Sequence, residues 1–187
     1  MAAASFLRTM YLTFFCKPAH VRQVFRLMRR CQPQNIVELG LVDVNRTVDL
    51  IQLAQRFAGP SPAIRYTGID LFDARPQSSP AITLKQTHQR LSSSGAKIQL
   101  VPGDAYSALQ RTANALGKAD LLLISQEQSA AQMELAWFFV PRILSDSAIV
   151  LWEQPPRDHG HASWRRVTAA EVETLATQAT PSRKRAA

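Results

Sequence analysis

Polar residues and a glycine recur where the apolar runs of this 187-residue chain end. They are Glu38 and Gly40, then Asp70, Asp104, Ser125 and Glu153. A carboxylate in such a place can accept hydrogen bonds from both hydroxyl groups of a ribose. A glycine there lets the backbone approach a ligand closely. The spacing therefore predicts a site for a nucleotide-like ligand.

Apolar runs alternate with helical patterns along most of the chain. We expect strands at residues 35–40, 64–70, 97–101, 120–124 and 148–152, with a short sixth strand at 164–167. We expect helices at 19–30, 47–57, 81–94, 105–116, 132–140 and 169–176. Strands that are apolar throughout favour a parallel sheet covered on both faces, whose carboxyl ends share one edge. The predicted fold class is α/β, a Rossmann-like three-layer α/β/α sandwich with a mostly parallel central sheet.

The same positions resemble the motifs of the class I S-adenosylmethionine (SAM)-dependent methyltransferases. The resemblance rests on residues 37–40 with Thr47, 68–70, 103–105 and 119–124, and covers roughly residues 34–154. It implies SAM as the cofactor and transfer of its methyl group to an unidentified acceptor. It places Glu38 and Gly40 by the methionine end of SAM, Asp70 on the ribose, and Asp104 with Ala105 around the adenine. The cofactor-binding set expected in this way is Glu38, Gly40, Asp70, Leu71, Asp104, Ala105 and Ser125.

The loop from Gly40 to Thr47 departs from the family pattern, because Val42 and Val44 stand where further glycines are common. A β-branched residue does not adopt a positive φ cheaply. Either the loop follows another path and still binds SAM, or the chain is a non-catalytic binding module that has lost the site. A dinucleotide-binding oxidoreductase is the weaker rival, since the complete Gly-x-Gly-x-x-Gly pattern is absent.

No catalytic residue is assigned, because aligning and desolvating the acceptor can suffice for transfer from a sulfonium. Where a base is needed, the candidates are Asp73, Glu153, His159 and His161. No metal is expected from the resemblance either, because in the metal-dependent branch of that family a carboxylate follows the fourth strand, where this chain has Ser125 and Gln126.

The formal net charge is +8, and no acidic residue precedes Glu38. The basic residues of that stretch are Arg8, Lys17, Arg22, Arg26, Arg29 and Arg30. They are interpreted either as a solvated helix face or as a contact surface for nucleic acid or an acidic partner. No membrane span is expected. Two cysteines without metal spacing favour a reducing, cytoplasmic location, although an Arg-rich start without acids also fits a transit peptide.

Three parts are expected along the chain. Residues 1–33 form a basic helical extension packed on the core, 34–177 the Rossmann-like domain, and 178–187 a disordered basic tail. The apolar stripe of Val21, Val24, Phe25 and Met28 favours packing of the extension on the sheet. The alternative is a cap over the acceptor site, and its residues near the ligand are Phe14, Phe15, His20 and Arg22.

Overall fold

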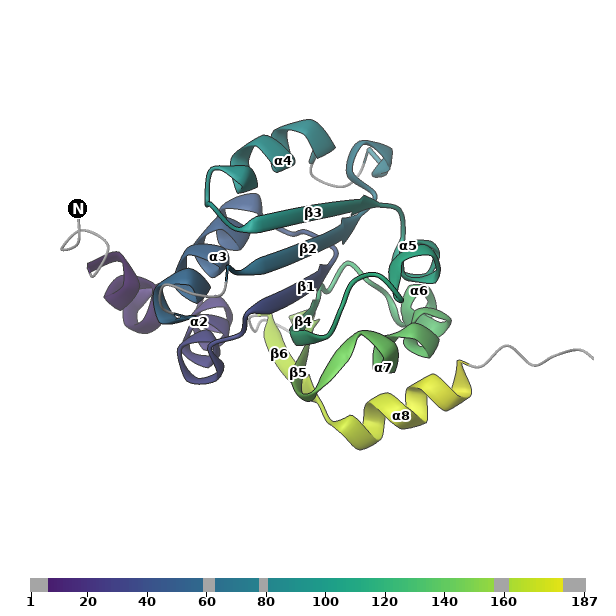
Figure 1. The fold of residues 1–187 in the computed structure, drawn as a ribbon. Coiled ribbons are helices and arrows are strands. Elements are labelled where there is room, and N and C mark those ends of the chain that lie inside the picture. The colour runs from purple at the N-terminus through teal and green to yellow at the C-terminus, as the bar shows by residue number, and fades with distance from the viewer. Residues whose placement is uncertain (1–6, 59–62, 78–80, 157–161, 180–187) are drawn as a thin grey trace, which may run out of the picture.

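One six-stranded sheet runs through the computed structural model, which describes residues 7–58, 63–77, 81–156 and 162–179 (Figure 1). The strand order is β3-β2-β1-β4-β5-β6. The bounds are β1 (Asn35–Leu39), β2 (Arg65–Asp70), β3 (Lys97–Pro102), β4 (Ala119–Ile124), β5 (Leu144–Gln154) and β6 (Ser163–Val167). Strands β1 to β5 are parallel, and β6 pairs antiparallel with β5. The predicted α/β class and the mostly parallel sheet are confirmed.

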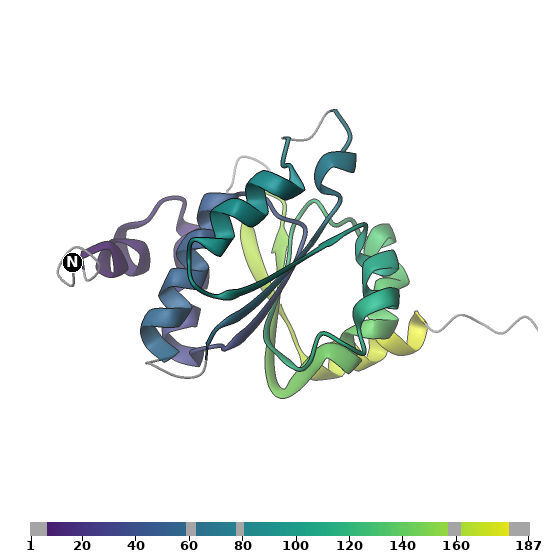
Figure 2. The same cartoon turned by 45° about the horizontal axis from the view of Figure 1, so that its top comes forward.

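Helices cover both faces of the sheet, so the molecule has three layers (Figure 2). One layer holds α2 (Ala19–Cys31), α3 (Val44–Ala58) and α4 (Leu84–Ser92), preceded by the π-helical turn η1 (Tyr11–Phe15). The other holds α5 (Ala105–Thr112), α6 (Ala130–Glu134), η3 (Ala136–Phe139), α7 (Val140–Ile143) and α8 (Ala169–Gln178). A short 3₁₀ turn, η2 (Phe72–Ala74), follows β2.

Each face of the sheet has its own hydrophobic core. Ile36 of β1 packs towards α2 and α3 with Phe25 and Trp164, whereas Val37 packs towards α5 with Leu109. In this second core the rings of Trp137 and Trp152 lie 5.7 Å apart. Because both faces are buried, the strands read as continuous apolar runs.

Several element bounds differ from the sequence prediction. Helix α3 begins at Val44 rather than at 47, and α4 begins at Leu84 after Thr83, whose side chain caps it. The single helix expected at 132–140 is instead the series α6, η3 and α7, and Pro141 lies in the first turn of α7. Proline lacks an N–H and cannot continue the hydrogen bonding of a preceding helix, so a break at this place is expected of it.

The basic N-terminal helix α2 packs against α3 and β6 (Figure 1). Val24, Phe25 and Met28 are its buried residues. Phe15 is 64% exposed. At the other end, α8 extends to Gln178, and residues 180–187 lie outside the described part.

Within the described ranges, no helix is long and apolar enough to cross a membrane. Within the same ranges, no three His, Cys, Asp or Glu side chains gather as a metal site would require.

Candidate functional site

The loops that follow β1, β2 and β4 meet at one edge of the sheet. The N–H of Gly40 donates to the carbonyl of Ile69 at 2.8 Å, and the N–H of Ser125 donates to the carbonyl of Leu39 at 2.9 Å. These bonds continue the sheet pairing past the last strand residues. The structure therefore brings Gly40, Asp70 and Ser125 to a common rim.

Gly40 is tightly covered at this rim. Its φ is +80°, and a Cβ atom added to it would lie 2.9 Å from the Cβ of Ser125 and 3.1 Å from Nε2 of Gln128. Glycine is required here by both its backbone conformation and its surroundings. The space that a side chain at position 40 would need is taken up by the side chains of Ser125 and Gln128.

Asp70 ends β2 with its carboxylate fully engaged. The N–H of Leu41 donates to Oδ2 at 2.7 Å, and that of Phe72 donates to Oδ1 at 2.8 Å. Arg75 forms a bidentate pair with the carboxylate, with Nε 2.7 Å from Oδ1 and Nη2 2.6 Å from Oδ2. The side chains of Asp70 and Arg75 are only 3% and 5% exposed. The oxygens predicted to bind ribose hydroxyls already hold four protein donors.

Arg75 also contacts the loops that follow β1 and β4. Its Nη2 donates to the carbonyl of Leu41, and its Nη1 lies 3.4 Å from Oε2 of Glu127. Hydrogen bonding to Asp70 outweighs burial and raises the pKa of Arg75. One guanidinium group thus ties together the loops that follow β1, β2 and β4.

The turn between Asp70 and Arg75 has an unusual backbone. Leu71 is half-buried and precedes η2, and Phe72 is buried with a φ of +48°. A positive φ is uncommon for a bulky residue and signals local strain.

Glu38 faces the layer of α3 rather than the rim. It is completely buried, and its carboxylate accepts bonds from Arg46 Nη2 at 2.7 Å, Thr47 Oγ1 at 3.0 Å and Tyr66 Oη at 2.7 Å. Burial, followed by the charge of Glu38, raises the pKa of Tyr66 well above its ordinary value. As placed, Glu38 anchors β1 to β2 and α3.

Glu153, a candidate base, belongs to the same buried cluster. Its Oε1 lies 3.4 Å from Arg46 Nη1 and 3.3 Å from His20 Nε2. Burial by itself lowers the pKa of Arg46, but Glu38 and Glu153 outweigh it and the pKa of Arg46 is raised. Glu153 is 2% exposed, so it is held inside this cluster rather than presented to a substrate.

The other predicted residues have structural partners as well. Asp104 caps α5, accepting from the N–H of Ser107 at 3.0 Å and from its hydroxyl at 2.5 Å, while Ala105 is buried in the first turn. Burial would raise the pKa of Asp104, but the bonds from Ser107 lower it. Asp73 accepts from the N–H of Leu84 at the start of α4. His159 and His161 lie outside the described residues.

The path of the loop after Gly40 shows how the two valines are accommodated. Among the described residues that are not glycine, only Gln32 and Phe72 have a positive φ. The loop therefore follows another path, on which Val44 opens α3 and packs on the core. With Asp70 engaged and Gly40 covered, the residues of this rim do not fit SAM in the conformation that the structure describes.

Sequence reasoning missed the two arginines that determine this arrangement. Arg46 lies on the buried stripe of α3 with Leu50 and Leu53, and a cation at that helical spacing is a signal that a partner carboxylate is needed. Arg75 lies in an irregular loop before Pro76 and gave no such signal.

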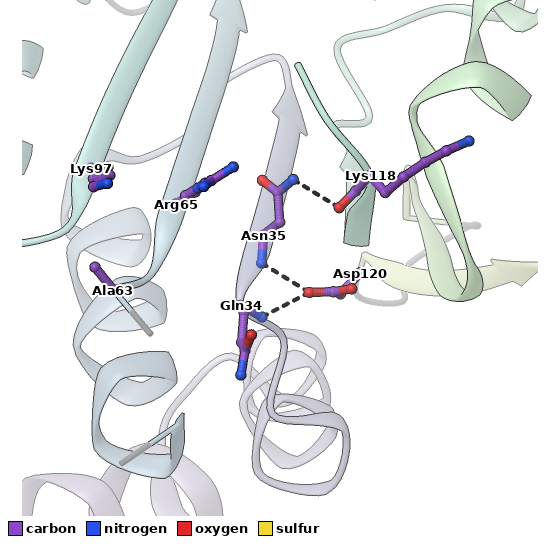
Figure 3. A pocket seen from close by; sticks show the side chains of 7 residues that line it. All are labelled: Gln34, Asn35, Ala63, Arg65, Lys97, Lys118 and Asp120. Carbon is purple, nitrogen blue, oxygen red and sulfur yellow. Dashed lines mark hydrogen bonds between the residues drawn. The ribbon is translucent and has the colours of Figure 1, made fainter. Parts of the chain in front are cut away.

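A cavity of about 320 Å³ lies at the opposite, amino edge of the strands (Figure 3). There Oδ2 of Asp120 accepts from the N–H groups of Gln34 and Asn35 at 2.9 and 3.0 Å, and Asn35 Nδ2 donates to the carbonyl of Lys118 at 2.8 Å. Asp120 thus fastens the start of β1 beside β4. It takes no part in the rim.

Comparisons with known proteins identify the fold. No family model matches the sequence, and no curated protein matches it either. Among solved structures, the O-methyltransferase TomG from Streptomyces achromogenes, in complex with SAM, matches with a TM-score of 0.55 at 12% identity, over 91% of this chain and 74% of TomG. The calicheamicin methyltransferase CalS11 matches with a TM-score of 0.55 at 15% identity, over 82% of this chain and 77% of that one.

An O-methyltransferase from Bacillus cereus, in complex with S-adenosylhomocysteine (SAH), matches with a TM-score of 0.52 at 14% identity, over 81% of this chain and 64% of that one. At these identities the likeness concerns the fold. The chain has the Rossmann-like fold of the class I SAM-dependent methyltransferases.

Proposed function

We propose that this protein is a binding module built on the methyltransferase fold, with its adenosyl site closed by Arg75, and that it acts by binding an anionic partner. The observation that carries this proposal is the saturation of Asp70 by two backbone N–H groups and the guanidinium of Arg75.

Arg75 must be displaced before a ribose can reach Asp70. A ribose that reaches Asp70 must first separate a buried ion pair and release Arg75 from the carbonyl of Leu41. Disrupting a buried pair costs about 3–5 kcal/mol. Such a cost lowers the apparent affinity for SAM by roughly 10²- to 10⁴-fold, since each 1.4 kcal/mol is a factor of ten.

The second candidate function is metal-independent methyl transfer from SAM to an unidentified acceptor. It is favoured by the likeness to methyltransferases solved with SAM and with SAH, and by the gathering of Gly40, Asp70 and Ser125 at one rim. In this function Arg75 leaves Asp70 when SAM enters.

Titration calorimetry with SAM and with SAH separates the two functions. For the wild-type protein, the closed site predicts no measurable heat up to about 1 mM ligand. Arg75→Ala frees the carboxylate and is expected to bind SAH measurably. Arg65→Ala is the matched control, because it removes an exposed arginine at the opposite edge of the sheet (Figure 3).

Micromolar binding of SAH by the wild-type protein would contradict the closed site and support methyl transfer. Absence of binding by Arg75→Ala, with its fold intact by circular dichroism, would show that Arg75 is not the group that closes the site.

A further inference from the structure

A groove of about 550 Å³ runs between α2 and β6 on the surface of the layer that holds α2. Four arginines line it, namely Arg22, Arg26, Arg30 and Arg166, together with Trp164. None of the described residues that line the groove is acidic.

The spacing of these residues directs them into one groove. Arg22, Arg26 and Arg30 are four residues apart on α2, so they form one ridge with a rise of about 6 Å between neighbours. Trp164 and Arg166 are two apart on β6 and share a face of that strand. Helix α2 packs against β6, so the two sets face one another.

Two of the arginines are held in place by carbonyl groups and keep further donors. Arg22 Nη1 donates to the carbonyl of Phe14 at 3.3 Å, and Arg26 Nε donates to that of Thr13 at 3.0 Å. Each guanidinium has five N–H groups. Within the described part of the chain, no carboxylate forms an ion pair with any of the four groove arginines.

Trp164, which lines the same groove, carries a buried donor. The residue is 7% exposed, and among the described residues its indole Nε1 has no hydrogen-bond acceptor. A buried donor without a partner is destabilising by about 1–3 kcal/mol, so an acceptor that reaches it from the groove relieves this cost.

We infer that the groove between α2 and β6 binds phosphate groups, which accept hydrogen bonds from Trp164 Nε1 and from the four arginines. Guanidinium groups match phosphate oxygens in a bidentate geometry, and a lining with four arginines and no carboxylate suits an anionic ligand. The site is independent of the adenosyl rim and does not depend on whether SAM binds.

The phosphate has two possible sources, a small polyphosphate and the backbone of a nucleic acid. We would titrate the wild-type protein with inorganic tripolyphosphate and with a single-stranded oligonucleotide, in chloride buffer at low and at high salt. Binding of tripolyphosphate alone identifies a small ligand. Much tighter, strongly salt-dependent binding of the oligonucleotide identifies a nucleic acid.

Three variants locate the site. Arg30→Gln is expected to weaken phosphate binding roughly tenfold, as loss of a charged hydrogen bond implies. Arg29→Gln removes the same charge from the neighbouring position, which lies outside the groove, and is expected to change binding by less than about twofold. Trp164→Phe keeps an aromatic ring but removes the N–H together with part of the indole, so it is expected to weaken binding several-fold.

Trp164→Phe has a second readout that a merely structural tryptophan would not give. Because its N–H has no acceptor in the free protein, phosphate is expected to raise the thermal midpoint of the wild-type protein more than that of the variant. The inference is overturned if neither probe binds at low salt, if Arg29→Gln and Arg30→Gln weaken binding equally, or if Trp164→Phe leaves the affinity unchanged.

Discussion

Two buried arginines form ion pairs with the carboxylates near the carboxyl ends of the strands. Arg46 lies between Glu38 and Glu153, and Arg75 holds Asp70. Each of these carboxylates has a fixed cation within 3.4 Å. Glu153 is buried and already contacts Arg46 and His20, so a substrate that used it as a base would have to displace these partners.

Tyr66 is expected to make the stability of the fold depend on pH. Burial and the charge of Glu38 raise its pKa, so the folded protein holds the phenol proton more tightly than the unfolded chain does. The resulting stability is present below a pH of about 10, the ordinary tyrosine value, and is lost as the pH rises further. Unfolding in urea at several pH values is expected to show a steeper alkaline loss of stability for the wild-type protein than for Tyr66→Phe.

At neutral pH, Tyr66→Phe is expected to lower the free energy of unfolding by about 1.5–3 kcal/mol, because Glu38 loses a charged hydrogen bond. Parallel curves for the two proteins above pH 10 would contradict this account of Tyr66.

The positions of the rim residues were predictable, but their partners were not. Gly40, Asp70 and Asp104 follow apolar runs, and strand pattern alone places such residues at one edge. The hydrogen bond from Arg75 to Asp70 depends on the φ of +48° at Phe72, and no periodicity in the sequence encodes that turn. The roles of these residues in binding SAM stay predictions.

In the loop from β1 to α3, Gly40 combines a positive φ with a lack of room for a Cβ atom. Gly40→Ala is expected to cost at least about 1–2 kcal/mol from its positive φ alone, and more from the contact with Ser125. Gly95→Ala is a matched control, since Gly95 has a φ of +78° but its nearest neighbour would lie 3.7 Å from the new Cβ.

The difference between the two variants, measured as free energies of unfolding, isolates the crowding above Gly40. Equal costs would show that Ser125 and Gln128 move aside easily.

Strands were predicted better than helices for a physical reason. Short apolar runs such as residues 120–124 mark buried strands almost directly, and β4 spans Ala119–Ile124. The series α6, η3 and α7 keeps apolar side chains at spacings of three and four residues, as in Met133, Ala136 and Val140. Since 3₁₀ and α turns share this spacing, the pattern reads as one helix.

The whole molecule buries two cores against a single sheet, and α2 contributes to one of them. We therefore expect the basic extension to unfold together with the rest. Phe25→Ala in α2 is expected to lower the free energy of unfolding by about 3–5 kcal/mol, and Leu109→Ala in α5 by about 2–5 kcal/mol. Both variants are expected to show one cooperative transition in calorimetry and in circular dichroism.

A separate early transition that only Phe25→Ala shifts would show that residues 1–33 form an independent unit. The same pair of variants therefore tests the predicted boundary at residue 33.

The tryptophans give each core its own optical signal. Trp164 lies in the core below α2, with the guanidinium of Arg46 5.6 Å from its ring centroid, whereas the tilted rings of Trp137 and Trp152 contact each other on the far face of the sheet. A protein that retains only Trp164 emits from one layer, and one that retains only Trp137 and Trp152 emits from the other. Intrinsic fluorescence can thus follow the two halves of the sandwich separately, without an added label.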